Sequence, residues 1–109
     1  MASIVDFQKL DIRVGKVIEV EDLEGAKKPI YKMRIDFGEL GVKNSAAGIK
    51  NEYKKEELLN KKVVAIVNLE PKNIAGFLSE CLILAAVTRD GKAVLLQPEK
   101  DVEVGSKIY

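Results

Sequence analysis

LDIRVGKVIEV, at residues 10–20, has the alternating pattern of a β-strand with a glycine at its centre. Apolar residues alternate with charged ones on both sides of the glycine, as Ile12 and Val14 do before it and Ile18 does after it. Gly15 interrupts the alternation, and a glycine inside a strand marks a bend or a bulge. We therefore predict one long strand that bends at Gly15 and serves two halves of a curved sheet.

The rest of the chain adds further strands and one helix. The clearest strand, at residues 30–37, places apolar side chains on one face and Lys32 and Arg34 on the other. Residues 51–61 are predicted as the principal helix, with Asn51 as its cap. Further strands are predicted at residues 42–49, 62–69, 81–87 and 93–96, with a turn at 88–91 and a short terminal strand within 98–109.

A long bent strand, a hairpin, one helix and further strands follow one another in the order that is typical of an OB-fold, a five-stranded β-barrel. We predict an all-β domain of this class over residues 1–109, with short extensions at both ends. The chain has 109 residues and a mass of 12.0 kDa, which fits a single domain. A chain of this size buries roughly two-thirds of its unfolded surface, so it needs no disulfide or metal to fold.

The residue counts exclude several kinds of chemistry. Histidine is absent and cysteine occurs once, at Cys81. A zinc site of Cys and His ligands, an intrachain disulfide and any nucleophile that depends on histidine therefore cannot form within one chain. No motif arranges the carboxylates and lysines for catalysis. We expect no catalytic residues, no metal and no cofactor, and hence a protein that is not an enzyme.

The charges are unevenly distributed, although the formal net charge is only +1. Residues 26–62 carry ten basic and five acidic side chains, whereas residues 1–25 carry three and six. A basic middle third indicates a positive surface that can meet an anion, the alternative being a solvated lysine-rich face. The longest apolar run, residues 81–87, is far shorter than the about 20 residues of a membrane span. No signal peptide is visible, and we expect a cytoplasmic location without membrane insertion.

Three motifs are more specific than the strand pattern. They are LDIRVGKV at residues 10–17, NLEPKNIAGFLSE at residues 68–80 and LLQP at residues 95–98. With these motifs in this order, the chain resembles the tRNA-binding domain family, which includes the C-terminal domain of many methionyl-tRNA synthetases and free-standing tRNA-binding proteins. The sequences IDFG at residues 35–38 and KNSAA at residues 43–47 are most similar to the CsaA subgroup of that family.

The resemblance implies an OB-fold core, a homodimer built by the terminal segments, and binding of tRNA or other structured RNA. For the CsaA subgroup it implies a chaperone-like role with unfolded or exported polypeptides. It implies no chemical reaction. The candidates for the dimer interface are apolar residues near both chain ends, namely Phe7, Ile12, Val102, Val104 and Ile108.

RNA binding is the first of two hypotheses. Lys32 and Arg34 alternate with apolar residues, so they point outwards if the apolar set is buried, and can then meet phosphates. Asn68 ends an apolar strand, where its side chain can equally bond the neighbouring backbone. Because the chain has six aromatic residues and no tryptophan, it suits folded RNA better than extended stacking on single strands. The candidate RNA-binding residues are Lys32, Arg34, Lys43, Asn44, Ser45, Lys50, Asn68, Lys72, Asn73, Ser79 and Glu80.

Polypeptide binding is the second hypothesis. Short segments of an unfolded chain can bind to an apolar patch formed by Ile74, Phe77 and Leu78. The rim of this patch consists of Lys72, Asn73 and Glu80. Phe77 and Leu78 can instead pack against a dimer partner. No Walker motif is present, so we do not expect chaperoning driven by ATP. The sequence leaves the choice of ligand open, and salt dependence distinguishes the two hypotheses because it affects phosphate contacts far more than apolar ones.

Overall fold

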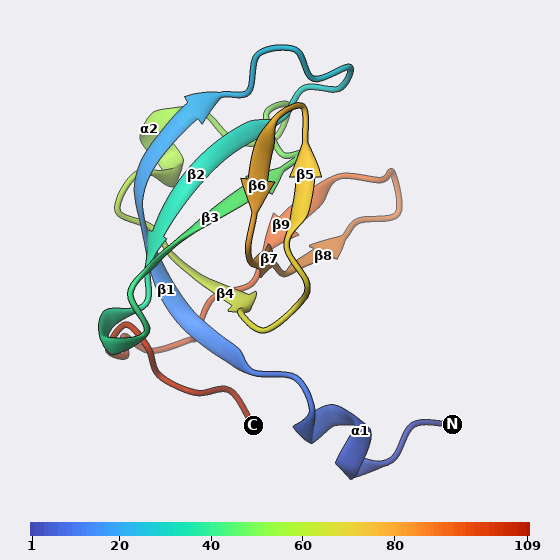
Figure 1. The fold of residues 1–109 in the computed structure, drawn as a ribbon, viewed down its shortest axis with the longest axis vertical. Coiled ribbons are helices and arrows are strands. Elements are labelled where there is room, and N and C mark those ends of the chain that lie inside the picture. Colours follow the sequence, from blue (N-terminus) through green and yellow to red (C-terminus); the bar gives the residue numbers. More distant parts are fainter.

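The computed structural model describes residues 1–109 and contains a five-stranded antiparallel sheet that curves into a nearly closed barrel (Figure 1). The order of its strands is β3-β2-β1-β4-β7. The all-β barrel of the OB class predicted from the sequence is thereby confirmed. The strands are β1 (Ile12–Asp22), β2 (Tyr31–Asp36), β3 (Val42–Ala47), β4 (Lys62–Ile66) and β7 (Leu82–Ile83).

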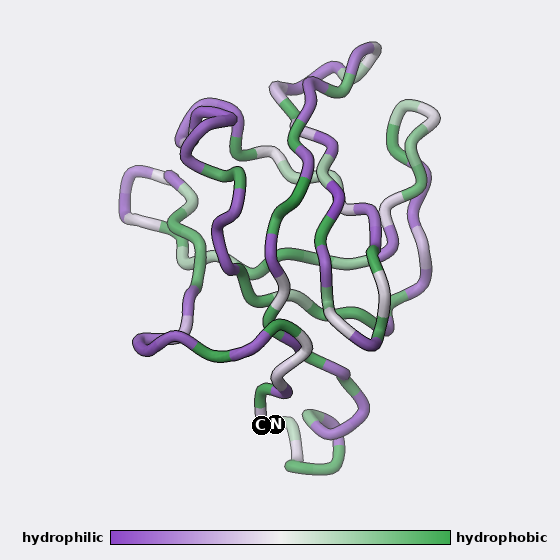
Figure 2. Tube along the Cα trace, turned by 90° about the vertical axis from the view of Figure 1, so that its left-hand side faces the viewer, coloured by the Kyte–Doolittle hydropathy of each residue, from purple (hydrophilic) through white to green (hydrophobic).

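Two hairpins and three short helical segments complete the fold. The hairpins join β5 (Lys72–Ile74) to β6 (Phe77–Ser79) and β8 (Ala85–Val87) to β9 (Ala93–Leu95). The helical segments are α1 (Ile4–Gln8), the 3-10 helix η1 (Gly38–Leu40) and α2 (Lys55–Leu58). None of these helices has the length and apolar character that crossing a membrane requires. Both chain ends lie at the same end of the molecule (Figures 1 and 2).

Strand β1 is long because it pairs with two strands. Its first half lies beside β4 and its second half beside β2, with Lys16 common to both ladders. The register shifts between Val17 and Glu19, which adds a β-bulge and increases the bend. The bend predicted for this strand is therefore present, and its bulge lies just after Gly15.

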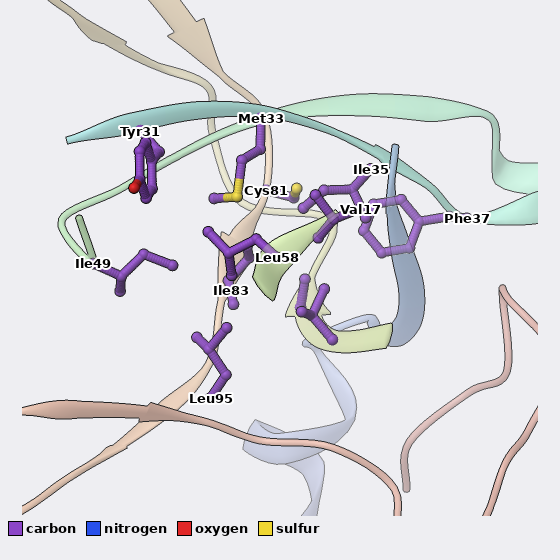
Figure 3. Close-up of a cluster of buried hydrophobic side chains, with 12 residues drawn as sticks. Val17, Tyr31, Met33, Ile35, Phe37, Ile49, Leu58, Cys81, Ile83 and Leu95 are labelled. Atoms are coloured by element: carbon purple, nitrogen blue, oxygen red, sulfur yellow. The ribbon is translucent and has the colours of Figure 1, made fainter. Parts of the chain in front are cut away.

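The barrel interior holds the main hydrophobic core (Figure 3). Hydrophobic and hydrophilic residues alternate along the strands (Figure 2), and the predicted apolar face of β2 is buried, with Met33 1% and Ile35 0% exposed. Leu58 is also 0% exposed and brings α2 against this core. The cluster comprises Val17, Tyr31, Met33, Ile35, Phe37, Ile49, Leu58, Val63, Ala65, Cys81, Ile83 and Leu95.

A smaller apolar cluster lies on the other side of β1 and β4. Alternation along β4 directs Val63 and Ala65 into the core and Val64 and Ile66 to the opposite side. We name this opposite set the outer cluster. It comprises Ile12, Val64 and Ile66, with Leu10, Leu84 and Ile108 packed against them.

The prediction of a helix over residues 51–61 is wrong in extent, because α2 has only four residues. Lys54 has an extended backbone, with φ −81° and ψ 156°, so the helix begins after it. The N-terminal cap is therefore Lys54 rather than Asn51, and its N–H donates to Glu57 Oε1 at 2.8 Å. At the other end, Asn60 has a φ of 68°, which no helix continues through.

Three other segments differ from the predictions. Residues 70–80, which lie between two predicted strands, contain the β5–β6 hairpin, and residues 81–87 are divided between β7 and β8. Helix α1 was not predicted, although its start carries a recognisable signal. Ser3 N donates to Asp6 Oδ2 at 3.0 Å, and Asp6 N donates to Ser3 Oγ at 3.3 Å, which is a capping box.

The C-terminal tail runs beside β1 without forming the predicted terminal strand. Its only ladder contact is an isolated bridge between Arg13 and Lys107. Gly105 N donates to Val14 O at 2.7 Å, and Arg13 Nη1 donates to Gly105 O at 3.0 Å. These bonds hold the tail against the strand that organises the barrel.

Candidate functional site

The candidate binding surface lies on the outward side of β1, β2 and β3. Alternation buries one side of β2, so Lys32 and Arg34 project from the other. The register places Arg34 between Glu19 of β1 and Asn44 of β3, and it places Lys32 beside Glu21 in the next row. We name the surface formed by these five residues the three-strand face.

Each basic residue of the three-strand face has a carboxylate of β1 beside it. Arg34 Nη1 lies 3.5 Å from Glu19 Oε2, and Lys32 Nζ lies 3.5 Å from Glu21 Oε2. The side chains of Arg34 and Glu19 are each 53% exposed. Long, exposed ion pairs contribute little to stability, so an incoming anion can separate them at small cost.

The β5–β6 hairpin is attached to the outer edge of β3 by the two residues that end it. Ser79 Oγ accepts a hydrogen bond from Ala46 N at 3.1 Å, and Glu80 Oε1 accepts one from Asn44 N at 2.9 Å. The main chain adds a bond from Glu80 N to Asn44 O at 2.8 Å. Ser79 and Glu80, which were predicted to contact RNA, therefore use these polar atoms to fix the hairpin.

A pocket of about 150 Å³ lies between this hairpin and the three-strand face. Phe77 forms one wall and is only partly buried, so it is sealed neither in the barrel nor elsewhere in the chain. Glu19 and Glu21 were not predicted at this site, and their alternation on the long strand was the available signal. The lining residues are Glu19, Glu21, Lys32, Met33, Arg34, Asn44 and Phe77.

Two predicted RNA-binding residues of β3 lie on its opposite side. Lys43 is paired with Ile35 and Ser45 with Met33, and cross-strand partners share a face. Ser45 is 0% exposed, and its hydroxyl donates to Cys81 O at 3.0 Å. Ser45 is therefore a core residue, and we exclude it and Lys43 from the candidate surface.

Lys50 belongs to a separate cluster at the end of β1. Its Nζ lies 2.9 Å from Asp22 Oδ1, while Lys55 Nζ lies 3.3 Å from Asp22 Oδ2. Hydrogen bonds from Lys50 and then Lys55 hold the pKa of Asp22 below its usual value. This cluster ties the segment before and within α2 to β1, and it does not extend the three-strand face.

The residues predicted to form a peptide-binding patch are divided by the register of the hairpin. Ile74 pairs with Phe77, whereas Leu78 pairs with Asn73 and projects from the other side. Asn73 Oδ1 accepts a hydrogen bond from Gly76 N at 2.9 Å, which stabilises the turn. A pocket of about 300 Å³ lies beside Ile74, and it is lined by Ala46, Leu69, Glu70, Lys72, Ile74, Ser79, Glu80, Cys81 and Leu82.

Residues 12–107, which span the whole barrel, match the family described as "Putative tRNA binding domain". The chain belongs to the tRNA-binding domain family. It is 49% identical over 104 residues to the methionine–tRNA ligase of Pyrococcus abyssi, and the match covers 94% of this chain and 14% of the ligase. The chain thus spans only a small part of the length of that relative.

Two solved structures are similar over the whole chain. The CsaA chaperone protein of Picrophilus torridus is 53% identical with a TM-score of 0.93, and the match covers 100% of both chains. The chaperone CsaA of Bacillus anthracis is 45% identical with a TM-score of 0.94, covering 100% of this chain and 99% of that one. The similarity to the CsaA subgroup predicted from the sequence is confirmed.

In this tRNA-binding domain, Asn68 connects the N-terminal segment to the end of β4. Its Oδ1 accepts a hydrogen bond from Asp11 N at 2.8 Å, and its Nδ2 donates to Lys9 O at 2.8 Å. Both ends of the amide are therefore used within the chain. Of the two interpretations left open by the sequence, the contacts favour the bonding of neighbouring backbone.

Replacing Asn68 by alanine is expected to lower the free energy of unfolding by about 1 to 3 kcal/mol, since two hydrogen bonds are lost and each contributes about 0.5 to 1.5 kcal/mol. Hydrogen exchange at the Asp11 amide should accelerate, because that N–H loses its acceptor. Asn73→Ala is the matched control, as it removes a hairpin-turn bond and should leave Asp11 unaffected. Equal exchange rates at Asp11 in both variants would contradict the role given to Asn68.

Cys81 is expected to be unreactive in the folded domain. It is 5% exposed, and burial raises the pKa of its thiol to about 11 from 9.0. A thiol reagent at pH 8 should therefore modify the unfolded chain quickly and the native chain very slowly. Between those two pKa values the unfolded state loses its proton first, so the free energy of unfolding should fall as pH rises.

Urea unfolding at pH 8 and pH 10 measures this effect. Cys81→Ala is the control, because it removes this thiol and keeps all other titratable groups of the chain. The wild type should lose more stability than the variant over this interval. Rapid modification of the native chain at pH 8 would show that the thiol is accessible, contrary to expectation.

Proposed function

We propose that this domain binds tRNA or another structured RNA through the three-strand face and acts as a binding module without catalytic activity. The observation that carries the proposal is the exposure of Lys32 and Arg34 side by side, with Asn44 in the same row as Arg34. Cations of this kind contact phosphates, and an amide can bond a ribose hydroxyl or a base edge. Membership of the tRNA-binding domain family supports the same ligand.

Titration with tRNA at several salt concentrations tests the proposal. Each phosphate contact releases counterions, so the logarithm of the affinity should fall linearly with the logarithm of the salt concentration. An unfolded polypeptide titrated against the same sample serves as the comparison. The absence of tRNA binding at low salt, or tRNA binding that salt leaves unchanged, would contradict the proposal.

Binding of unfolded or exported polypeptides is the second candidate function. It is supported by the pocket of about 300 Å³ beside Ile74, where Leu69 and Leu82 provide apolar walls. The relatives described as CsaA chaperones also support it. Capture of an apolar segment should depend little on salt, so the titration above separates this candidate from RNA binding.

We also propose that the domain forms a homodimer through α1 and the outer cluster. Helix α1 has five residues and buries none of them, with Ile4 68% and Val5 59% exposed. A helix this short is unstable alone, and its exposed apolar residues favour a partner surface. Beside it, Phe7 and Ile108 line a pocket of about 280 Å³.

The proposed interface contains three of the predicted residues, Phe7, Ile12 and Ile108. It leaves out the two valines of the tail. These valines do not pack against the outer cluster: the carbonyl oxygen of Val102 accepts a hydrogen bond from Lys62, and Val104 lies against Gly38.

Exchanging Ile4 and Val5 for glutamate is expected to convert the dimer to monomers. Dimerisation would bury at least about 1,000 Å² in total, and two unpaired charges cannot be accommodated there. Leu40→Glu with Val42→Glu is the matched control, since both residues are 40% exposed outside the proposed interface. Sedimentation should give twice 12.0 kDa for wild type and control. A wild type that sediments as a monomer at micromolar concentration would contradict the proposal.

A further inference from the structure

The pocket between the hairpin and the three-strand face has a single aromatic wall, the ring of Phe77. The other aromatic residues are placed elsewhere, with Tyr31 and Phe37 in the core, Tyr53 packed against it, and Phe7 and Tyr109 near the chain ends. Stacking of successive bases needs successive aromatic platforms. A single platform at this site suits one unstacked base and no more.

The remaining walls carry hydrogen-bonding groups beside apolar surface. Five of the seven lining residues are charged or polar. The main-chain N and O of Asn44 are bonded to Glu80, whereas its side-chain amide makes no hydrogen bond within the chain. Arg34 and Glu19 add donors and an acceptor in the same row. A base edge carries both donors and acceptors and can satisfy these groups, which an apolar side chain cannot.

The size and stiffness of the pocket agree with this chemistry. A volume of about 150 Å³ is of the order that holds one aromatic ring. The wall that carries Phe77 is fixed, because Ser79 and Glu80 bond the hairpin to β3 at 3.1 Å and 2.9 Å. A fixed platform loses little conformational freedom when a ligand binds.

We propose that this pocket takes a single unpaired nucleobase of a structured RNA, stacked on Phe77 with its polar edge towards Asn44 and Arg34. The inference rests on the proposed RNA-binding function and adds to it the structural feature that the RNA must present. Lys32 and Arg34 attract the phosphates of any RNA, whereas the pocket selects an RNA that carries a bulged or looped-out nucleotide.

Two RNA duplexes that share one strand test the proposal, with 2-aminopurine in the shared strand either paired or bulged. The wild type should bind the bulged duplex about tenfold or more tightly than the paired one, which is the size of effect that stacking gives. The 2-aminopurine emission should be quenched on binding of the bulged duplex only. Phe77→Ala should abolish the preference and the quenching while binding the paired duplex as before.

Leu78→Ala is the matched control, because Leu78 is the next residue of β6, projects from the other side and is 48% exposed. It should keep both the preference and the quenching, and circular dichroism should show both variants folded. Equal affinities of the wild type for the two duplexes would overturn the proposed role of the pocket while leaving the proposed RNA binding intact. Failure to bind either duplex or tRNA would overturn both the role of the pocket and the proposed RNA-binding function. A Phe77→Ala variant that loses affinity for an unfolded polypeptide alone would assign the pocket to apolar side chains and overturn the proposal.

Discussion

Alanine at Gly15 is expected to lower the free energy of unfolding by about 3 kcal/mol, at the upper end of what overpacking usually costs. A Cβ at this position would lie 2.6 Å from Ile35 Cγ2 and 2.6 Å from Phe37 Cε1, which is closer than such atoms approach. Both neighbours are 0% exposed, so they have no free space into which to move. Since β1 pairs with β2 and β4 around this point, a shift of its backbone would disturb both ladders.

Gly48→Ala is the matched control for this experiment. A Cβ at Gly48 would meet nothing within 4 Å, and the residue has no positive φ. It should leave stability unchanged or raise it by up to about 1 kcal/mol, because alanine reduces the freedom of the unfolded chain. Urea unfolding of the two variants gives the comparison. Identical midpoints would show that β1 tolerates a side chain at its bend, contrary to expectation.

Replacing Lys32 and Arg34 together by alanine is expected to have the largest effect on RNA binding. If each side chain contacts one phosphate, the slope of log affinity against log salt should flatten by about 0.7 to 0.9 for each contact. The affinity for tRNA at low salt should fall accordingly, and affinities for fully paired RNAs of different sequence should fall in parallel because phosphate contacts carry no sequence information. Unfolding should change little, because the ion pairs at 3.5 Å are exposed.

Arg89→Ala with Lys92→Ala is the control, since it removes the same charge from the exposed turn between β8 and β9. The control should keep the wild-type salt slope. Equal slopes for the two double variants would mean that the three-strand face makes no phosphate contacts, and RNA would then have to bind elsewhere.

The alternation of apolar residues was sufficient to predict the barrel. Residues 30–37 place Met33 and Ile35 inside and Lys32 and Arg34 outside, as period two requires. The length of the helix predicted at residues 51–61 was overestimated. Composition favours a helix there, whereas contacts with distant parts of the chain decide where it ends. One such contact is the hydrogen bond from Asn60 N to Val17 O at 2.8 Å.

The candidate site was only partly predictable, because the polar side chains of a motif can bond either a ligand or the backbone of their own chain. Asn68, Ser79 and Glu80 have the side chains that bind ligands, yet each bonds the backbone of a segment more than 30 residues away. The face on which Lys43 projects depends on the register between β2 and β3, which alternation within one strand cannot supply. Predicting these contacts needs the three-dimensional neighbours that the sequence leaves unspecified.

Ser79 and Glu80 also determine how the domain behaves towards other molecules of itself. β3 is the last strand on its side of the sheet, and an unprotected sheet edge is a template for intermolecular pairing and aggregation. The two side chains bond the N–H groups of Ala46 and Asn44, which are the groups a foreign strand would need. The hairpin therefore shields the edge of β3. If heating detached the hairpin, this edge would be exposed and molecules of the domain could aggregate through it.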